Sequence, residues 1–150
     1  MCVQLVRGNG PIKLRESGMP YEKAWKRFFA PTRALRLLGL SKNTLDVVDF
    51  GCGYGTFTIP AARIVRGKVF AIDIEPEMIK IVEEKAKRSK LDNVVPILRD
   101  FMSEGSGLED SSVDFAMLFN ILHVEEPTKL LRKLTGFSDT AEDLALFTGT

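Results

Sequence analysis

The chain has 150 residues, which is enough for one domain with a buried core. Hydrophobic residues make up 45% of the chain and charged residues 27%, a balance that is typical of globular proteins and excludes a disordered or fibrous chain. The formal net charge of +1 provides no overall attraction for a polyanion, so no nucleic-acid partner is evident, although the charge does not exclude one. Cys2 and Cys52 form neither a disulfide framework nor a zinc motif, and no apolar run reaches the ~18 residues of a membrane span. These features predict a cytoplasmic protein without a membrane partner.

The first predicted elements precede the strand-rich part of the chain. Residues 1–20 contain glycines and prolines that interrupt any regular pattern, so we expect an irregular segment. From Tyr21 to Leu40 the apolar residues recur with helical spacing, and Pro31 is expected to divide this stretch into two helices. The helical spacing favours a core position for four aromatic residues, with a position over a ligand pocket as the alternative: Tyr21, Trp25, Phe28 and Phe29.

From residue 47 onward, strand patterns alternate with helix patterns. The predicted strands cover residues 47–50, 68–72, 93–98 and 112–120. The predicted helices cover about residues 56–65, 76–89 and 127–134. This order is typical of the α/β class and predicts a Rossmann-like open parallel sheet with flanking helices. Ligands bind such sheets at the carboxyl ends of the strands.

The turn after the first predicted strand has the pattern G-x-G-x-G, with Gly51, Gly53 and Gly55. Glycine permits positive φ and a close approach of the backbone to a ligand, and the following helix presents free N–H groups. A dinucleotide-binding turn would require glycine at position 56, where this chain has Thr56. Asp49 beside the turn would repel a pyrophosphate. It would attract a ligand that carries an ammonium and a sulfonium group.

Two more acidic residues follow the next two predicted strands. Asp73 lies 22 positions after Gly51, where an acid can accept hydrogen bonds from both hydroxyls of a ribose. Asp100 and Phe101 can accept from an adenine amino group and flank its ring. Each acid alone has a structural alternative, since Asp73 can cap the helix that opens at Pro76 and Asp100 can be an ordinary loop residue. Acids at three consecutive strand ends favour one shared ligand.

The chain resembles a class I S-adenosylmethionine-dependent methyltransferase of the small-molecule type over about residues 16–134. The resemblance rests on the segments VVDFGCGYGTFTIPAAR, VFAIDIEPEM, ILRDF and VDFAMLFNILHVEEP. It implies S-adenosylmethionine as cofactor. The residues that it assigns to this cofactor are Asp49, Gly51, Cys52, Gly53 and Gly55 at the glycine turn and the methionine end, Asp73 at the ribose, Ile74 and Met78 along the adenosine, Asp100 and Phe101 at the adenine, and Asn120 below the sulfonium.

Methyl transfer from a sulfonium requires placement of the acceptor and exclusion of water more than acid–base chemistry. His123 is the candidate base for a protonated acceptor, although the interpretation as a residue that packs over the cofactor is favoured. Cys52 could act as a nucleophile, but the interpretation as a small residue within the turn is favoured. We expect transfer to a small-molecule acceptor. The alternatives are a cofactor-binding fragment without activity and a nicotinamide-dependent dehydrogenase.

The family pattern stops after Leu134, the end of a predicted domain at residues 21–134. The resemblance implies about seven strands and the sequence predicts about four, so we expect an incomplete sheet whose fourth strand is an exposed edge open to self-association. Residues 135–150 are an atypical tail. One permitted coding of residues 134–150, read from its third base, encodes a Gly-Gly turn followed by an apolar strand. We therefore hypothesise that the tail is frameshifted.

Overall fold

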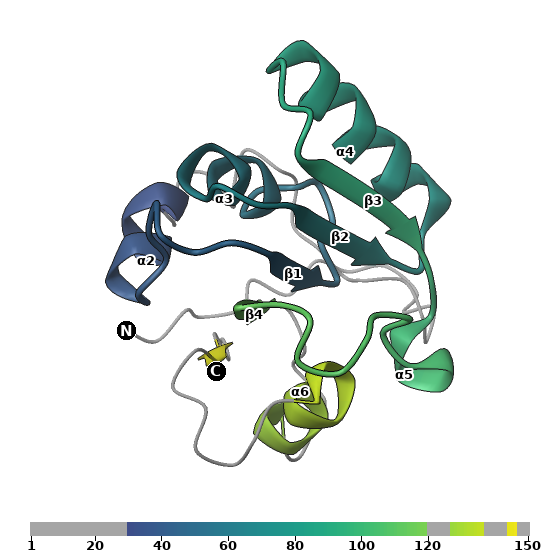
Figure 1. The fold of residues 1–150 in the computed structure, drawn as a ribbon. Helices are drawn as coiled ribbons and strands as arrows, with labels where there is room; N and C mark the ends of the chain where they lie inside the picture. The colour runs from purple at the N-terminus through teal and green to yellow at the C-terminus, as the bar shows by residue number, and fades with distance from the viewer. Residues whose placement is uncertain (1–29, 120–126, 137–143, 147–150) are drawn as a thin grey trace, which may run out of the picture.

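The computed structural model describes residues 30–119, 127–136 and 144–146 (Figure 1). Within these residues, one parallel sheet has the strand order β3-β2-β1-β4-β5, with helices on both of its faces. The strands are β1 (Val47–Phe50), β2 (Val69–Asp73), β3 (Val94–Leu98), β4 (Phe115–Leu118) and β5 (Leu144–Leu146). The helices are α2 (Pro31–Leu37), α3 (Thr58–Ile64), α4 (Pro76–Arg88), α5 (Phe101–Glu104) and α6 (Pro127–Thr135). The prediction of a Rossmann-like α/β sheet is confirmed.

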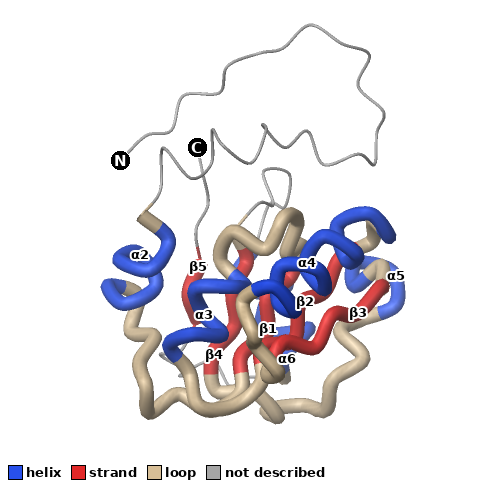
Figure 2. The backbone as a smooth tube through the Cα atoms, turned by 90° about the horizontal axis from the view of Figure 1, so that it is seen from above, coloured by secondary structure: helices blue, strands red, loops and turns tan. Residues whose placement is uncertain are grey.

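Side-chain alternation along β1 divides the core into two layers. Val47 contributes to the layer under α2 and α3, whereas Val48 and Phe50 contribute to the layer with α5 and α6. Figure 1 shows α3 and α4 on one side of the sheet and α6 on the other. Figure 2 shows the strands side by side in the order of the sheet, from β3 to β5. All of β1 is buried, as expected for a central parallel strand, so Asp49 within it is a buried acid that faces α3.

Helix α4 shows how the sequence sets the element boundaries. Pro76 stands in its first turn, where the missing N–H costs nothing. Met78, Val82 and Ala86 recur at helical spacing and are buried against the sheet. Basic residues in the last turn complement the helix dipole, and the helix ends before Ser89. Within the described ranges, no helix is long and apolar enough to cross a membrane.

The predicted open edge at β4 is wrong. Residues Leu144–Leu146 pair with β4 in parallel, with Leu144 opposite Ala116 and Leu146 opposite Leu118. A three-residue strand is too short to produce a periodic pattern, which is why the sequence predicted about four strands and missed the fifth. Because β5 covers the outer side of β4, the predicted self-association through that edge has no support.

A further difference follows the third predicted strand. Phe101–Glu104 forms the short helix α5, which is not among the predicted helices. Asp100 precedes this helix as its N-cap, and its side chain accepts a hydrogen bond from the Ser103 N–H. The predicted irregular segment at residues 1–20 and the aromatic stripe that follows it lie outside the described residues.

Candidate functional site

The glycine turn lies at the carboxyl end of β1 and folds back onto β2. Gly51, Gly53 and Gly55 all have positive φ, at 68°, 51° and 72°. The N–H groups of Gly51 and Cys52 donate to the Ile72 carbonyl at 2.8 and 3.1 Å. Glycine is required for this backbone path because other residues rarely adopt such angles. The sequence pattern therefore located a turn whose shape depends on its three glycines.

Asp73, the last residue of β2, binds the glycine turn directly. Its Oδ2 accepts a hydrogen bond from the Gly53 N–H at 2.9 Å, and its Oδ1 accepts from the Glu75 N–H at 3.0 Å. Asp73 is not the N-cap of α4, because Glu75 occupies that position. A carboxylate offers about four lone-pair positions, so two remain for other donors such as hydroxyl groups.

Asp49 is buried below the turn, with 2% of its surface exposed. Its Oδ2 accepts a hydrogen bond from Thr58 Oγ1 at 2.7 Å. Burial raises the pKa of Asp49 from 3.8 to about 7; the Thr58 hydrogen bond acts in the opposite direction, and the charge of Asp73 adds to the rise. A cation bound above the turn would favour the ionised carboxylate.

The raised pKa of Asp49 predicts a pH-dependent stability. The folded chain binds the Asp49 proton more tightly than the unfolded chain does. Ionisation therefore leaves the free energy of unfolding unchanged below about pH 3.8, the unfolded pKa, and lowers it by about 4 kcal/mol once the pH exceeds the folded pKa of about 7. Asp49→Asn cannot ionise but keeps an oxygen for Thr58. We expect it to raise the free energy of unfolding at pH 8 by about 1–3 kcal/mol, since the buried NH₂ offsets part of the gain.

Thermal denaturation of both proteins between pH 4 and 8 measures this effect. The curve for Asp49→Asn should be flatter than that of the unchanged chain between pH 4 and 7. Asp92→Asn, at an exposed position outside the turn, is the control and should follow the unchanged chain. If Asp49→Asn keeps the full pH dependence, another group is responsible for it.

The other residues predicted near the turn divide between core and surface. Cys52 is 7% exposed and packs among apolar side chains that include Val82. Burial, with the nearby charge of Asp49, raises the pKa of the Cys52 thiol above its usual range, which disfavours the nucleophile alternative. Met78 is buried on α4, whereas Ile74 is 41% exposed just after β2. Of these side chains, only that of Ile74 is open to a ligand without rearrangement.

At the end of β3 the structure separates two residues that were predicted to act together. Asp100 is half-buried and caps α5, with its Oδ1 3.4 Å from the Ser103 nitrogen. The Phe101 ring is buried in the core, where its centroid lies 5.1 Å from that of Phe50. Asp100 therefore lies at the carboxyl edge, whereas Phe101 supports it from inside. The predicted site residues outside the described ranges are Asn120 and His123.

Lys85 was not predicted and contacts the glycine turn. This lysine lies on α4, and its Nζ donates to the Tyr54 carbonyl at 2.7 Å. The same Nζ lies 6.0 Å from the centre of the Tyr54 ring. In the sequence, Lys85 is one of several charged residues in the segment predicted to form this helix. Only its half-buried position in the fold distinguishes it.

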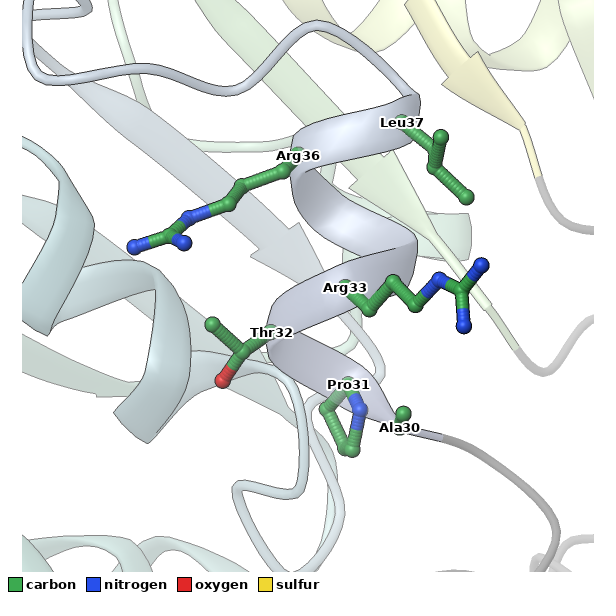
Figure 3. A pocket seen from close by; sticks show the side chains of 6 residues that line it. All are labelled: Ala30, Pro31, Thr32, Arg33, Arg36 and Leu37. Atoms are coloured by element: carbon green, nitrogen blue, oxygen red, sulfur yellow. The ribbon is translucent and has the colours of Figure 1, made fainter.

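A hollow of about 450 Å³ lies along α2, away from the predicted cofactor residues (Figure 3). In Figure 3, Thr32 and Arg36 point to one side of the helix and Arg33 and Leu37 to the other. Binding sites have polar groups that converge on the ligand, and here they diverge from one short helix. The described residues that line the hollow are Ala30, Pro31, Thr32, Arg33, Arg36 and Leu37. The glycine turn therefore remains the candidate functional site.

The sheet, the turn and its acids together define a class of protein. Asp49, Asp73 and Asp100 belong to three neighbouring strands or the loops that directly follow them, and the glycine turn lies between the first two. The fold is a Rossmann-like one, and folds of this kind bind ligands at the carboxyl ends of their strands, which makes this edge of β1, β2 and β3 the candidate site. An acid beneath the glycine turn is suited to a ligand with a positive charge.

The comparison with protein families identifies the family within this class. The family model described as "Methyltransferase domain" matches residues 41–141, which is more than half of the chain. The chain belongs to this family. The predicted membership of the class I S-adenosylmethionine-dependent methyltransferase family is confirmed.

Solved structures and curated proteins agree with this assignment. A crystal structure of a SAM-dependent methyltransferase from Aquifex aeolicus is 32% identical with a TM-score of 0.61, covering 71% of this chain and 57% of that one. The tRNA (guanine(37)-N(1))-methyltransferase Trm5b of Pyrococcus abyssi is 40% identical over 78 residues, covering 50% of this chain and 23% of that protein. The ribosomal protein L11 methyltransferase of Thermotoga neapolitana is 27% identical over 124 residues, covering 76% of this chain and 46% of that protein. The chain spans less than half the length of these two curated relatives.

These relatives correct the prediction about partners. The sequence was interpreted as having a small-molecule acceptor and no evident nucleic-acid partner. The names of the two curated relatives specify a tRNA and a ribosomal protein as acceptors. The prediction failed because net charge describes the whole chain, whereas the resemblance on which the acceptor was based covers a cofactor-binding region that enzymes with different acceptors share.

Proposed function

We propose that this chain binds S-adenosylmethionine at the carboxyl edge of β1, β2 and β3 and transfers its methyl group to an acceptor. The observation that carries the proposal is the hydrogen bond of 2.9 Å between the Gly53 N–H and Asp73 Oδ2. It joins the glycine turn to the acid at the end of β2. The two parts of a ligand that the turn and the acid would bind are therefore held at a fixed separation.

Each of the acids has a part in this proposal. Asp49 lies below the turn and supplies a negative charge for the ammonium group of the ligand. Asp73 keeps two lone-pair positions for the ribose hydroxyls. Asp100 lies at the next strand end and accepts from the adenine amino group, and the exposed Ile74 side chain contacts the adenosine. The same residues were predicted from the sequence, and Phe101 is now assigned a supporting position instead of a direct contact.

When held by the glycine turn, Asp49, Asp73 and Asp100, S-adenosylmethionine would supply a methyl group that its sulfonium already activates for transfer. The chain has no covalent step to perform. Its residues orient the two reactants and exclude water from the reacting atoms. Asp49 would stabilise the ammonium group of the bound cofactor, which the demethylated product keeps.

RNA is the first acceptor that we propose, because the P. abyssi tRNA methyltransferase is 40% identical to this chain over 78 residues. A ribosomal protein is the second, because the similarity to the L11 methyltransferase extends over 124 residues. Transfer of a radiolabelled methyl group from the cofactor to bulk tRNA, to ribosomal proteins and to a cell extract compares these acceptors in one assay.

The proposal is tested first by calorimetric titration with S-adenosylhomocysteine, and NADH is titrated in parallel. We expect binding of the former and none of the latter. Binding of S-adenosylhomocysteine without transfer to any fraction would support the alternative of an inactive cofactor-binding fragment. Binding of NADH alone would support the dehydrogenase alternative and overturn the proposal.

A further inference from the structure

Hydrogen bonds restrain nearly every peptide group of the glycine turn. The bond at the Tyr54 carbonyl comes from Lys85, which lies outside the turn on α4. The Gly55 N–H donates to the Cys52 carbonyl at 2.9 Å, which holds one side of the peptide between Tyr54 and Gly55. The other side of this peptide is the Tyr54 carbonyl, which accepts from Lys85 Nζ at 2.7 Å. This peptide is therefore restrained at both ends, and Lys85 provides one of the two restraints.

The preceding peptide, between Gly53 and Tyr54, is free to bind a ligand. Within the described residues, the Tyr54 N–H has no hydrogen-bond partner. On one side of it, Asp73 holds the Gly53 N–H. On the other side, Lys85 holds the Tyr54 carbonyl. The two side chains together fix the orientation of an unpaired donor in the middle of the turn.

We propose that Lys85 is a positioning residue for the cofactor, which keeps the glycine turn in the conformation that receives the amino-acid end of S-adenosylmethionine. This inference rests on the proposed cofactor site. Three glycines with positive φ make the unrestrained turn flexible, because glycine has more accessible backbone conformations than any other residue. A ligand that binds only one of these conformations loses apparent affinity in proportion to the fraction of time the turn spends elsewhere. Lys85 raises the population of the competent conformation without itself contacting the reacting atoms.

The contact is suited to this role because it is charged and partly shielded from water. The ammonium group donates to a carbonyl at a short distance, and hydrogen bonds with an ionised partner are about twice as strong as neutral ones. The side chain of Lys85 is half-buried, whereas that of Lys80 on the same helix is exposed. Lys80 is therefore a matched control for the loss of one positive charge from α4.

The test compares two ligands on three variants. S-adenosylhomocysteine carries the amino-acid end, and 5′-methylthioadenosine lacks it while keeping the adenosine. For Lys85→Met we expect the affinity for S-adenosylhomocysteine to fall about 10- to 30-fold, with less than about a 3-fold change for 5′-methylthioadenosine. Lys85→Arg keeps a charged donor and should recover most of the loss. Lys80→Met should bind both ligands as the unchanged chain does.

A purely structural role for Lys85 gives a different result. In that case both affinities fall by the same factor, or the melting temperature falls with both affinities unchanged, and either result overturns the proposal. Tyr54→Ala separates the ring contact of Lys85 from its hydrogen bond to the Tyr54 carbonyl, since it removes the ring but keeps the carbonyl, and it should retain most of the affinity. If Lys85→Met does not fold, Lys85→Gln provides the same comparison with a neutral donor. Failure of the unchanged chain to bind S-adenosylhomocysteine would count against the cofactor site itself, not against Lys85 in particular.

Discussion

Asp73→Ala is expected to weaken the binding of S-adenosylhomocysteine by about 2–3 kcal/mol, or roughly 30- to 150-fold. Two losses add to this effect. The ribose hydroxyls lose a charged acceptor, and the Gly53 N–H loses the partner that it has at 2.9 Å. The variant is also expected to be less stable, because the Glu75 N–H is left without its acceptor. Titration calorimetry at a temperature where circular dichroism shows a folded chain measures the affinity alone.

Two variants separate the contributions in this experiment. Asp73→Asn keeps one oxygen acceptor, so its affinity should lie between those of Asp73→Ala and the unchanged chain. Asp92→Ala removes an exposed acid outside the turn and should bind normally. Unchanged affinity in a folded Asp73→Ala protein would rule out the assignment of Asp73 to the ribose.

Gly53→Val is expected to abolish cofactor binding, with a loss of more than about 100-fold in affinity. The φ of Gly53 is 51°, in the left-handed region, where a non-glycine residue costs about 1–2 kcal/mol and a β-branched one more. The backbone there also forms the hydrogen bond to Asp73, so a shift that relieves the strain breaks the link to β2. The new side chain further occupies the approach of the ligand to the backbone.

Gly39→Val provides the matched control for backbone strain. Gly39 has a φ of 98°, and a Cβ built on it would meet nothing within 4 Å. It lies in the loop between α2 and β1, so a substitution there should lower stability but leave cofactor affinity unchanged. A folded Gly53→Val protein that binds the cofactor normally would show that the turn has only a structural role.

The regular elements of the sheet were predictable because their residues depend on local pattern and burial. The apolar run Val47–Phe50 is β1 as predicted, and α4 begins at Pro76 as predicted. The short elements were not predictable in this way. Helix α5 has four residues and depends on the Asp100 cap and on the burial of Phe101 against Phe50. These contacts exist only once β1 and β3 share a sheet.

The parts of the candidate site that depend only on the order of the strands could be predicted from the sequence. The glycine turn and Asp73 could be located because parallel strands place their carboxyl ends on one edge. Their mutual hydrogen bond, the burial of Asp49 and the contact of Lys85 with Tyr54 depend on distances between elements. A sequence does not encode such distances in any local pattern.

The predicted domain limits at residues 20 and 134, and the frameshift hypothesis for the tail, stay predictions. One structural observation bears on the frameshift hypothesis: in the present reading frame, Leu144–Leu146 forms β5 and pairs with β4. The nucleotide sequence decides the question. The hypothesis is abandoned if the alternative frame after codon 134 soon reaches a stop codon or encodes no strand pattern.

The buried carboxyl of Asp49 has a consequence for the heat of cofactor binding. With a pKa of about 7, roughly half of the unliganded molecules carry a proton on this group at neutral pH. A bound ammonium nearby would lower that pKa, so binding would release up to about half a proton to the buffer. The measured enthalpy should then differ between phosphate and Tris, which have different ionisation enthalpies, and Asp49→Asn should remove the difference. Ligand affinity and proton release would thus be linked through one buried side chain.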